Sequence, residues 1–425
     1  MSSHPFTAAA TTAATAVPAT SGPPRRSLIG RILGGVAALL ATFVVLLTAL
    51  VMLGSYIPAI PKVGVIGPVL GGQYPFHMAL FAVMGSALAL LAWRLGLVRW
   101  GRTVTVTGVL SLAGALVIAG VQYVDAEAVG TDVSFSEVFT QIAYPGTKPD
   151  TTQTYATHDG EALQVDAYLP DGADARDDGD AAGRGGGKVP AIVLAHAGGF
   201  HVFDKSDLRG TGRWLADHNV AAFAIDYRLA TPERATWDKA PYDLVDALRW
   251  VQDHADEYGI DPDRISMGGM SAGGVLALNT SYRLQNGTIE AINGRTPEAP
   301  ASVVGFYPGT DVNEMWERNI DGSRNAAELF TGGTPEQYPD RYREVSPTSD
   351  IRPGLQPTLL VVGDRDRGTT PTDVRRFGNA LRAEGVDTKV KELPFAVHAF
   401  DDAYGSLSSQ ASRQILLDFL TAGTS

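Results

Sequence analysis

The sequence predicts an α/β fold in which a mostly parallel eight-stranded sheet carries helices on both faces, preceded by a three-helix transmembrane region. The first third of the 425 residues contains long apolar runs with almost no charge. Beyond them, short apolar runs alternate with helical patterns, as in folds built from repeated βα units. Glycine-rich turns follow two of the short runs, at the edge of the sheet where such folds bind ligands.

Charge and composition exclude several classes of function. Acidic residues outnumber basic residues by 46 to 34, and a net charge of −12 offers no attraction to a nucleic acid. We therefore expect no nucleic-acid partner. The chain contains no cysteine, which excludes disulfides, thiolate nucleophiles and cysteine-bound metals.

The N-terminus combines a polar tail with a first apolar run. Residues 1–26 are rich in Ala, Thr, Ser and Pro, and we expect them to be disordered. Residues 33–53 are almost wholly apolar and uncharged, which is long enough for a helix to cross a membrane. A cleaved signal peptide is the alternative, but its apolar core is usually about 7–15 residues long.

Two further apolar runs complete a transmembrane region over residues 27–124. The run 74–93 begins at Tyr74 and ends at Trp93, which suits the two interfaces of a membrane. The run 104–121 is weaker because hydroxyl side chains interrupt it at Thr105, Thr107 and Ser111. We predict three membrane-spanning helices, with a buried soluble helix as the alternative for the third.

Positive charges predict the orientation of these spans. The arginines near the span ends are Arg25, Arg26, Arg31, Arg94, Arg99 and Arg102. They lie before the first span and between the second and third, whereas the loop 54–73 has only Lys62. Because Arg and Lys accumulate in cytoplasmic loops, the N-terminus and second loop are expected in the cytoplasm. Three crossings then place residues 125–425 on the extracytoplasmic side of a multi-pass membrane protein.

Residues 125–425 show the alternation expected of a catalytic α/β domain. The stretch 153–168 alternates in the manner of two antiparallel strands. The β-rich runs that follow are 191–195, 220–225, 265–268, 303–307, 358–362 and 388–393. Helical patterns cover 208–218, 242–258, 274–284, 372–384 and 410–420. This order predicts a mostly parallel sheet covered on both faces.

Two irregular segments interrupt the alternation. Residues 171–188 are rich in Gly, Ala and Asp and predict an exposed loop. The end of this loop resembles a phosphate-binding loop, but Val189 stands where that motif needs Ser or Thr. Residues 311–350 contain no strand, and we expect them to form a partial cap over the site.

The strongest chemical signal is Gly269-Met270-Ser271-Ala272-Gly273, which lies between a predicted strand and a predicted helix. This context is typical of a nucleophile elbow, in which a serine occupies a sharp, strained turn. Side chains two positions before and after the serine would collide with neighbouring backbone, which explains the glycines. The motif therefore predicts Ser271 as a nucleophile.

A second motif, His196-Ala197-Gly198-Gly199-Phe200, directly follows the strand 191–195. Glycines at such a position let backbone N–H groups approach a substrate carbonyl and stabilise the charge of a tetrahedral transition state. We assign the N–H groups of Gly198, Gly199 and Ala272 to this oxyanion hole. An ordinary turn after a buried strand is the alternative.

With Asp226-Tyr227-Arg228-Leu229-Ala230, these motifs resemble the hormone-sensitive-lipase-like and carboxylesterase branch of the α/β-hydrolase family, over residues 154–420. The resemblance implies an α/β-hydrolase fold for the catalytic domain. Ala197 departs from the pattern, which usually has Gly there. We expect Tyr227 and Arg228 to brace the loop beneath the oxyanion hole rather than to contact substrate.

A serine hydroxyl is a weak nucleophile, so a base must accept its proton and an acid must orient that base. The chain order in this fold is Ser, acid, His, and His398 is the only histidine after Ser271. Two candidates for the acid, Asp364 and Asp366, follow the strand 358–362. The resemblance selects Asp366, because the family's aspartate usually stands three positions after the glycine.

These residues predict hydrolysis of a carboxylic ester, of a small molecule or a lipid, through an acyl-enzyme intermediate. The mechanism needs no cofactor and no metal, and the sequence has no zinc-protease or dinucleotide motif in the right context. A peptidase or amidase on the same scaffold and a catalytically silent binding module are the alternatives. Transport by the helices is disfavoured, because their interiors contain no charged residue.

Overall fold

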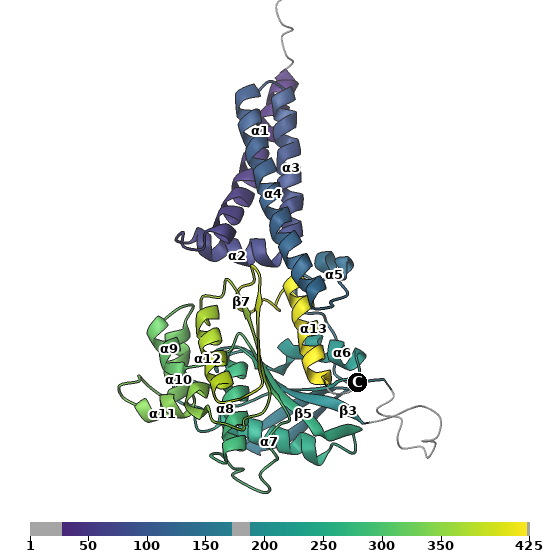
Figure 1. The fold of residues 1–425 in the computed structure, drawn as a ribbon. Helices are drawn as coiled ribbons and strands as arrows, with labels where there is room; N and C mark the ends of the chain where they lie inside the picture. The colour runs from purple at the N-terminus through teal and green to yellow at the C-terminus, as the bar shows by residue number, and fades with distance from the viewer. Residues whose placement is uncertain (1–27, 172–187, 423–425) are drawn as a thin grey trace, which may run out of the picture.

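The computed structural model describes residues 28–171 and 188–422. The predicted tail 1–26 and nearly all of the predicted loop 171–188 lie outside the described residues. Figure 1 shows a bundle of long helices standing on an α/β domain. The N-terminal helical region, as we call the bundle, consists of α1 (Leu28–Tyr56), α2 (Val63–Gln73), α3 (Pro75–Arg94) and α4 (Val98–Ala128).

Three of these helices, α1, α3 and α4, are long and apolar enough to cross a membrane. The predicted runs 33–53 and 104–121 fall inside α1 and α4, and the run 74–93 begins one residue before α3. The helix α4 is continuous through the hydroxyl side chains of the third run, and two of them bond to carbonyls one turn back: Thr107 Oγ1 donates to Thr103 O at 3.1 Å and Ser111 Oγ to Thr107 O at 3.0 Å. The helix continues to Ala128, past the predicted boundary at residue 124.

The short helix α2 is absent from the sequence-based prediction, which treated 54–73 as a loop. It lies across the base of the bundle, between the long helices and the α/β domain (Figure 1). Small residues permit this packing, since a Cβ added at Gly67 would overlap the backbone of Gly54 in α1. Ser55 Oγ also donates to Gly67 O at 2.8 Å. Glycines in this segment therefore allow close packing between helices.

The α/β domain is built on an eight-stranded sheet in the order β1-β2-β4-β3-β5-β6-β7-β8. Its strands are β1 (Thr151–His158), β2 (Glu161–Tyr168), β3 (Val189–Ala195), β4 (Ala221–Ile225), β5 (Ile260–Met270), β6 (Val303–Phe306), β7 (Thr358–Gly363) and β8 (Thr388–Leu393). The pairs β1–β2 and β2–β4 are antiparallel, and all the others are parallel. The predicted fold class is confirmed.

Helices cover both faces of the sheet. One buried apolar cluster joins the sheet to α7 (Ala240–Asp253), α8 (Ala272–Asn286) and α12 (Pro371–Ala383). A second cluster joins the opposite face to α6 (Arg209–Asp217) and α13 (Leu407–Thr421). Alternate residues of β3 divide between the two clusters, with Val193 in the first and Leu194 in the second. Five helices thus match the predicted helical patterns, although α7 ends five residues before its predicted end at 258.

The connection between β6 and β7 carries the segment predicted as a partial cap. It contains α9 (Val312–Arg318), α10 (Ser323–Thr331), α11 (Pro339–Glu344) and the 3-10 helix η3 (Pro347–Asp350). Two short elements outside this segment were not predicted, α5 (Phe135–Thr140) and the 3-10 helix η2 (Lys205–Leu208). Both are too short to produce a recognisable apolar period.

Candidate active site

Ser271 occupies a strained turn between β5 and α8. Its backbone has φ 51° and ψ −114°, a conformation that costs a residue with a side chain about 1–3 kcal/mol. A Cβ added at Gly269 would overlap the carbonyl of Gly273, and a Cβ added at Gly273 would overlap the Ala195 oxygen. The two glycines of the motif therefore allow the strand, the turn and the helix to approach this closely.

The imidazole of His398 lies next to this serine. Its Nε2 is 2.9 Å from Ser271 Oγ, so the two atoms are within hydrogen-bonding distance. His398 stands on the loop after β8, and the loop after β7 supports it through a hydrogen bond from Arg365 N to Ala396 O at 2.9 Å. Neighbouring strands β7 and β8 thus bring together residues that are distant from Ser271 in sequence.

The structure distinguishes the two acid candidates by geometry. His398 Nδ1 donates to Asp366 Oδ2 at 2.8 Å. Asp366 is buried and accepts three further hydrogen bonds, from Gly368 N, Thr369 N and Thr369 Oγ1, each at 2.9 Å. The Asp364 carboxylate instead lies 3.4 Å from Arg365 Nη1. Only Asp366 is therefore placed to orient the imidazole.

Charges around the imidazole favour its protonated form. Burial acts to lower the pKa of His398, but the carboxylate of Asp366, assisted by Asp401 and Asp402, outweighs burial and raises that pKa. Asp401 is itself buried, and desolvation together with the charge of Asp402 raises its pKa to about 6. The Tyr307 hydroxyl donates to Asp401, and the Tyr307 ring meets the His398 ring edge-on at 4.7 Å.

Sequence reasoning missed Thr369, Tyr307 and Asp401. Thr369 Oγ1 donates to Asp366 Oδ2 and lies 3.1 Å from Tyr307 O, and so links the acid to the loop after β6. The pair Asp401-Asp402, three and four residues after His398, is a signal that could have drawn attention to that side of the site. Nothing in the local pattern around Tyr307 or Thr369 indicates their contacts, which cross between strand ends.

The candidate oxyanion loop has the backbone that its glycines suggested. Gly198 and Gly199 have φ values of +115° and +56°, in the left-handed region that favours glycine. In the described parts of the chain, the N–H groups of Gly198, Gly199 and Ala272 have no protein acceptor. These three donors thus remain available to a ligand.

Of the two residues expected to brace the oxyanion loop, Tyr227 contacts the loop and Arg228 does not. The Tyr227 hydroxyl donates to His196 O at 3.0 Å, and the two rings stack with centroids 4.3 Å apart. Tyr227 therefore does brace the loop. Arg228 is directed instead to α7, where its Nη2 lies 2.7 Å from the fully buried Asp243. Its contribution to the loop is indirect, through the position of Tyr227.

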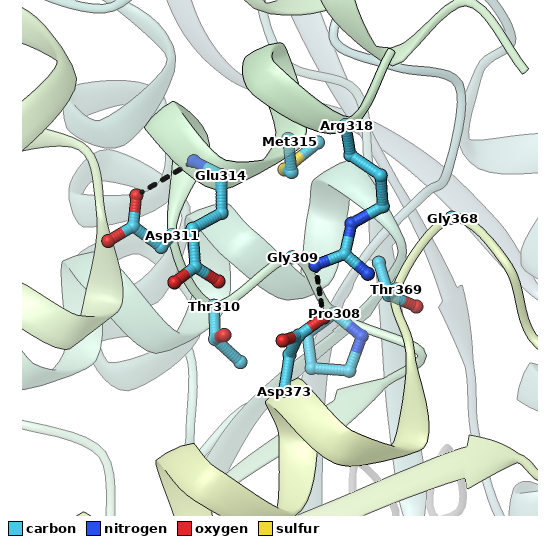
Figure 2. Close-up of a pocket in the computed structure, with 10 residues that line it drawn as sticks. All are labelled: Pro308, Gly309, Thr310, Asp311, Glu314, Met315, Arg318, Gly368, Thr369 and Asp373. Carbon is cyan, nitrogen blue, oxygen red and sulfur yellow. Dashed lines mark hydrogen bonds and ion pairs between the residues drawn. The ribbon is translucent and has the colours of Figure 1, made fainter. Parts of the chain in front are cut away.

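The segment 311–350 contacts both the oxyanion loop and the acid loop. The Phe330 ring of α10 stacks on Phe200 with centroids 4.0 Å apart. Figure 2 shows a small pocket in which α9 faces Gly368, Thr369 and the start of α12, and Arg318 forms an ion pair with Asp373 at 2.5 Å. The lining residues are Pro308, Gly309, Thr310, Asp311, Glu314, Met315, Arg318, Gly368, Thr369 and Asp373. The segment thus contacts two loops of the site, and its role as a partial cap stays a prediction.

Comparison with known proteins agrees with the class that fold and site define, the α/β-hydrolases. The model of a family named BD-FAE matches residues 182–381. The ethyl acetate hydrolase of Pseudomonas putida is 30% identical over 302 residues, which cover 67% of this chain and 86% of that protein. The chain belongs to the α/β-hydrolase family, in its carboxylesterase and hormone-sensitive-lipase-like branch.

Other relatives are more distant or matched over less of their length. Esterase LipC of Mycobacterium tuberculosis is 27% identical over 210 residues, which cover 48% of this chain and 51% of that protein. The chain thus spans about half the length of LipC. A solved structure of a thermophilic esterase from Thermogutta terrifontis with bound propionate superposes with a TM-score of 0.52 at 23% identity. It covers 66% of this chain and 96% of its own, and this likeness concerns the fold.

Proposed function

We propose that this protein hydrolyses carboxylic esters through an acyl-enzyme intermediate on Ser271. The observation that carries the proposal is the unbroken series of contacts from Ser271 Oγ to His398 Nε2 and from His398 Nδ1 to Asp366 Oδ2. This is the arrangement by which a base activates a hydroxyl and an acid orients the base. The relatives named as esterases and as an ethyl acetate hydrolase favour esters over amides.

In the proposed reaction, Ser271 Oγ attacks the ester carbonyl while His398 Nε2 takes its proton. The N–H groups of Gly198, Gly199 and Ala272 stabilise the negative oxygen that forms. His398 then gives the proton to the departing alcohol, which leaves the acyl group on Ser271. Water attacks the acyl-enzyme by the same route and releases the acid. These steps route no proton or electron through a metal or cofactor.

A comparison of matched substrates tests the proposal. Full-length protein in detergent micelles would be assayed with p-nitrophenyl acetate and with the p-nitroanilide of the same acyl group. We expect turnover of the ester and far slower turnover of the anilide. Faster cleavage of the anilide would favour the amidase alternative, and no turnover of either would favour the binding module. Esters of increasing acyl length would then separate small-molecule from lipid substrates.

The activity should depend on the protonation of His398. Only the neutral imidazole can accept the serine proton, so kcat/KM is expected to rise with pH through the pKa of His398. Because neighbouring carboxylates raise that pKa, the midpoint should lie above the ordinary value of 6.5. Asp401 is ionised above about pH 6, and Asp401→Asn should move the midpoint to lower pH. A pH profile of kcat/KM for both proteins measures this, and an unchanged midpoint in the variant would contradict it.

We further propose that α1, α3 and α4 cross the membrane and carry the catalytic domain on the extracytoplasmic side. The support is their length and apolar composition, together with arginines near the start of α1, at the end of α3 and near the start of α4. Alkaline phosphatase, which is active only outside the cytoplasm, would be fused after residue 425. We expect phosphatase activity from whole cells. If the phosphatase were inactive and green fluorescent protein fused at the same position were fluorescent, the catalytic domain would lie in the cytoplasm and the proposed orientation would be wrong.

A further inference from the structure

The loop that carries His398 lies directly against the N-terminal helical region. We call residues 394–399 the histidine loop, and Figure 1 shows the chain after β8 reaching the base of the bundle, beside α2. The Phe395 ring packs against the buried cluster of the bundle, to which α1, α3 and α4 all contribute. It also meets the Tyr56 ring edge-on with centroids 5.5 Å apart. The loop is thus anchored in the bundle three residues before His398.

Hydrogen bonds from the bundle hold carbonyl groups at both ends of the histidine loop. Gln122 Nε2 of α4 lies 3.1 Å from Pro394 O and 2.8 Å from Gly72 O, and so joins α4, α2 and the loop. Gln73 Nε2, at the end of α2, donates to Ala399 O at 3.3 Å. Gln122 is only 2% exposed, and a buried amide is costly unless its donors are used. These contacts bracket His398 on both sides.

The backbone of the histidine loop is strained at the same two ends. Phe395 and Ala399 have φ values of 56° and 55°, in the left-handed region that residues with side chains rarely adopt. Such conformations persist when the surrounding structure holds them. Gly72 leaves no free space at this contact, since an added Cβ would overlap the Phe395 carbonyl oxygen. The bundle therefore contributes contacts that keep the loop in this shape, in addition to the bond from Arg365 N to Ala396 O.

We propose that the N-terminal helical region positions His398 for catalysis, through Gly72, Gln73 and Gln122, in addition to carrying the domain. The inference rests on the proposed function, because it concerns the base of the same reaction. It also accounts for the number of helices, since a single anchoring helix could not enclose Phe395 or present α2 to the loop. The three residues are positioning residues, as they act through His398 and not on the substrate.

A pair of glycine substitutions in full-length protein tests the proposal. Gly72→Ala adds a methyl group where the Phe395 carbonyl lies, so α2 or the histidine loop must move. The matched control is Gly120→Ala in α4, where an added Cβ meets nothing within 4 Å. With p-nitrophenyl acetate in detergent, we expect Gly72→Ala to lower kcat by about 10- to 100-fold with little change in KM, because small displacements of a catalytic group cost rate. Gly120→Ala should match the wild type.

A second variant keeps the test decisive if Gly72→Ala does not fold. Gln73→Leu removes the donor to Ala399 O with a side chain of similar size, and we expect a smaller loss of kcat, about threefold, again at unchanged KM. Loss of kcat in either variant, with Gly120→Ala unaffected, supports the proposal. Wild-type kcat in both variants, a loss through KM alone, or an equal loss in Gly120→Ala overturns it. Absence of turnover in the wild type would instead count against the proposed function.

Discussion

Replacing Ser271 by alanine is expected to lower kcat/KM toward p-nitrophenyl acetate by about 10⁴-fold or more. The reason is that no other group supplies the nucleophile that forms the acyl-enzyme, whereas the oxyanion donors remain and account for some residual rate. Steady-state kinetics of the full-length variant, with active-site titration of the wild type, measures the effect.

The control for this prediction is Ser281→Ala in α8, the helix that follows Ser271. Ser281 is fully buried, and its hydroxyl has no hydrogen-bond partner in the described part of the chain. Its removal should therefore leave kcat/KM close to the wild-type value. A Ser271→Ala variant that keeps more than about a tenth of wild-type activity would mean that another residue attacks the ester.

The second large effect is expected for Asp366→Asn, with a fall in kcat of about 10³- to 10⁴-fold. An amide in place of the carboxylate leaves the shape of the site intact, but it no longer favours the imidazole tautomer that accepts the serine proton, nor stabilises the imidazolium. His398 Nδ1 would face a neutral group at the present 2.8 Å contact. Kinetics at several pH values would measure the loss.

Asp364→Asn is the matched variant, two residues away in the same turn. Its carboxylate lies toward Arg365 and does not contact the imidazole, so the variant should keep kcat within about threefold of the wild type. If Asp364→Asn proved the more damaging of the two, the assignment of the acid would be wrong.

The sequence predicted the sheet and the serine turn because both depend on local patterns. Short apolar runs between helical patterns are enough to indicate parallel strands. The turn at Ser271 needs glycines at fixed positions, because a Cβ added at Gly269 would overlap the carbonyl of Gly273. For the acid, spacing left two aspartates open, and the family resemblance selected the one that lies beside His398 in the structure.

Other features depend on contacts between distant segments, which a single sequence does not reveal. The helix α2 was not predicted, and the packing partners of its glycines are in α1 and in the histidine loop. The bond from Tyr307 to Asp401 joins residues 94 positions apart. The contact of Gln73 with Ala399 spans 326 positions. The sequence therefore indicated the chemistry of the site, whereas its support became visible only in three dimensions.

Labelling with a fluorophosphonate tests the central claim most directly, because the reagent reacts with a serine only when a base has activated it. Full-length protein would be labelled in detergent, digested, and the modified residue located by mass spectrometry. We predict one adduct, on Ser271, and strongly reduced labelling of His398→Gln. Absence of any adduct on folded protein, or an adduct on a different serine, would contradict the account.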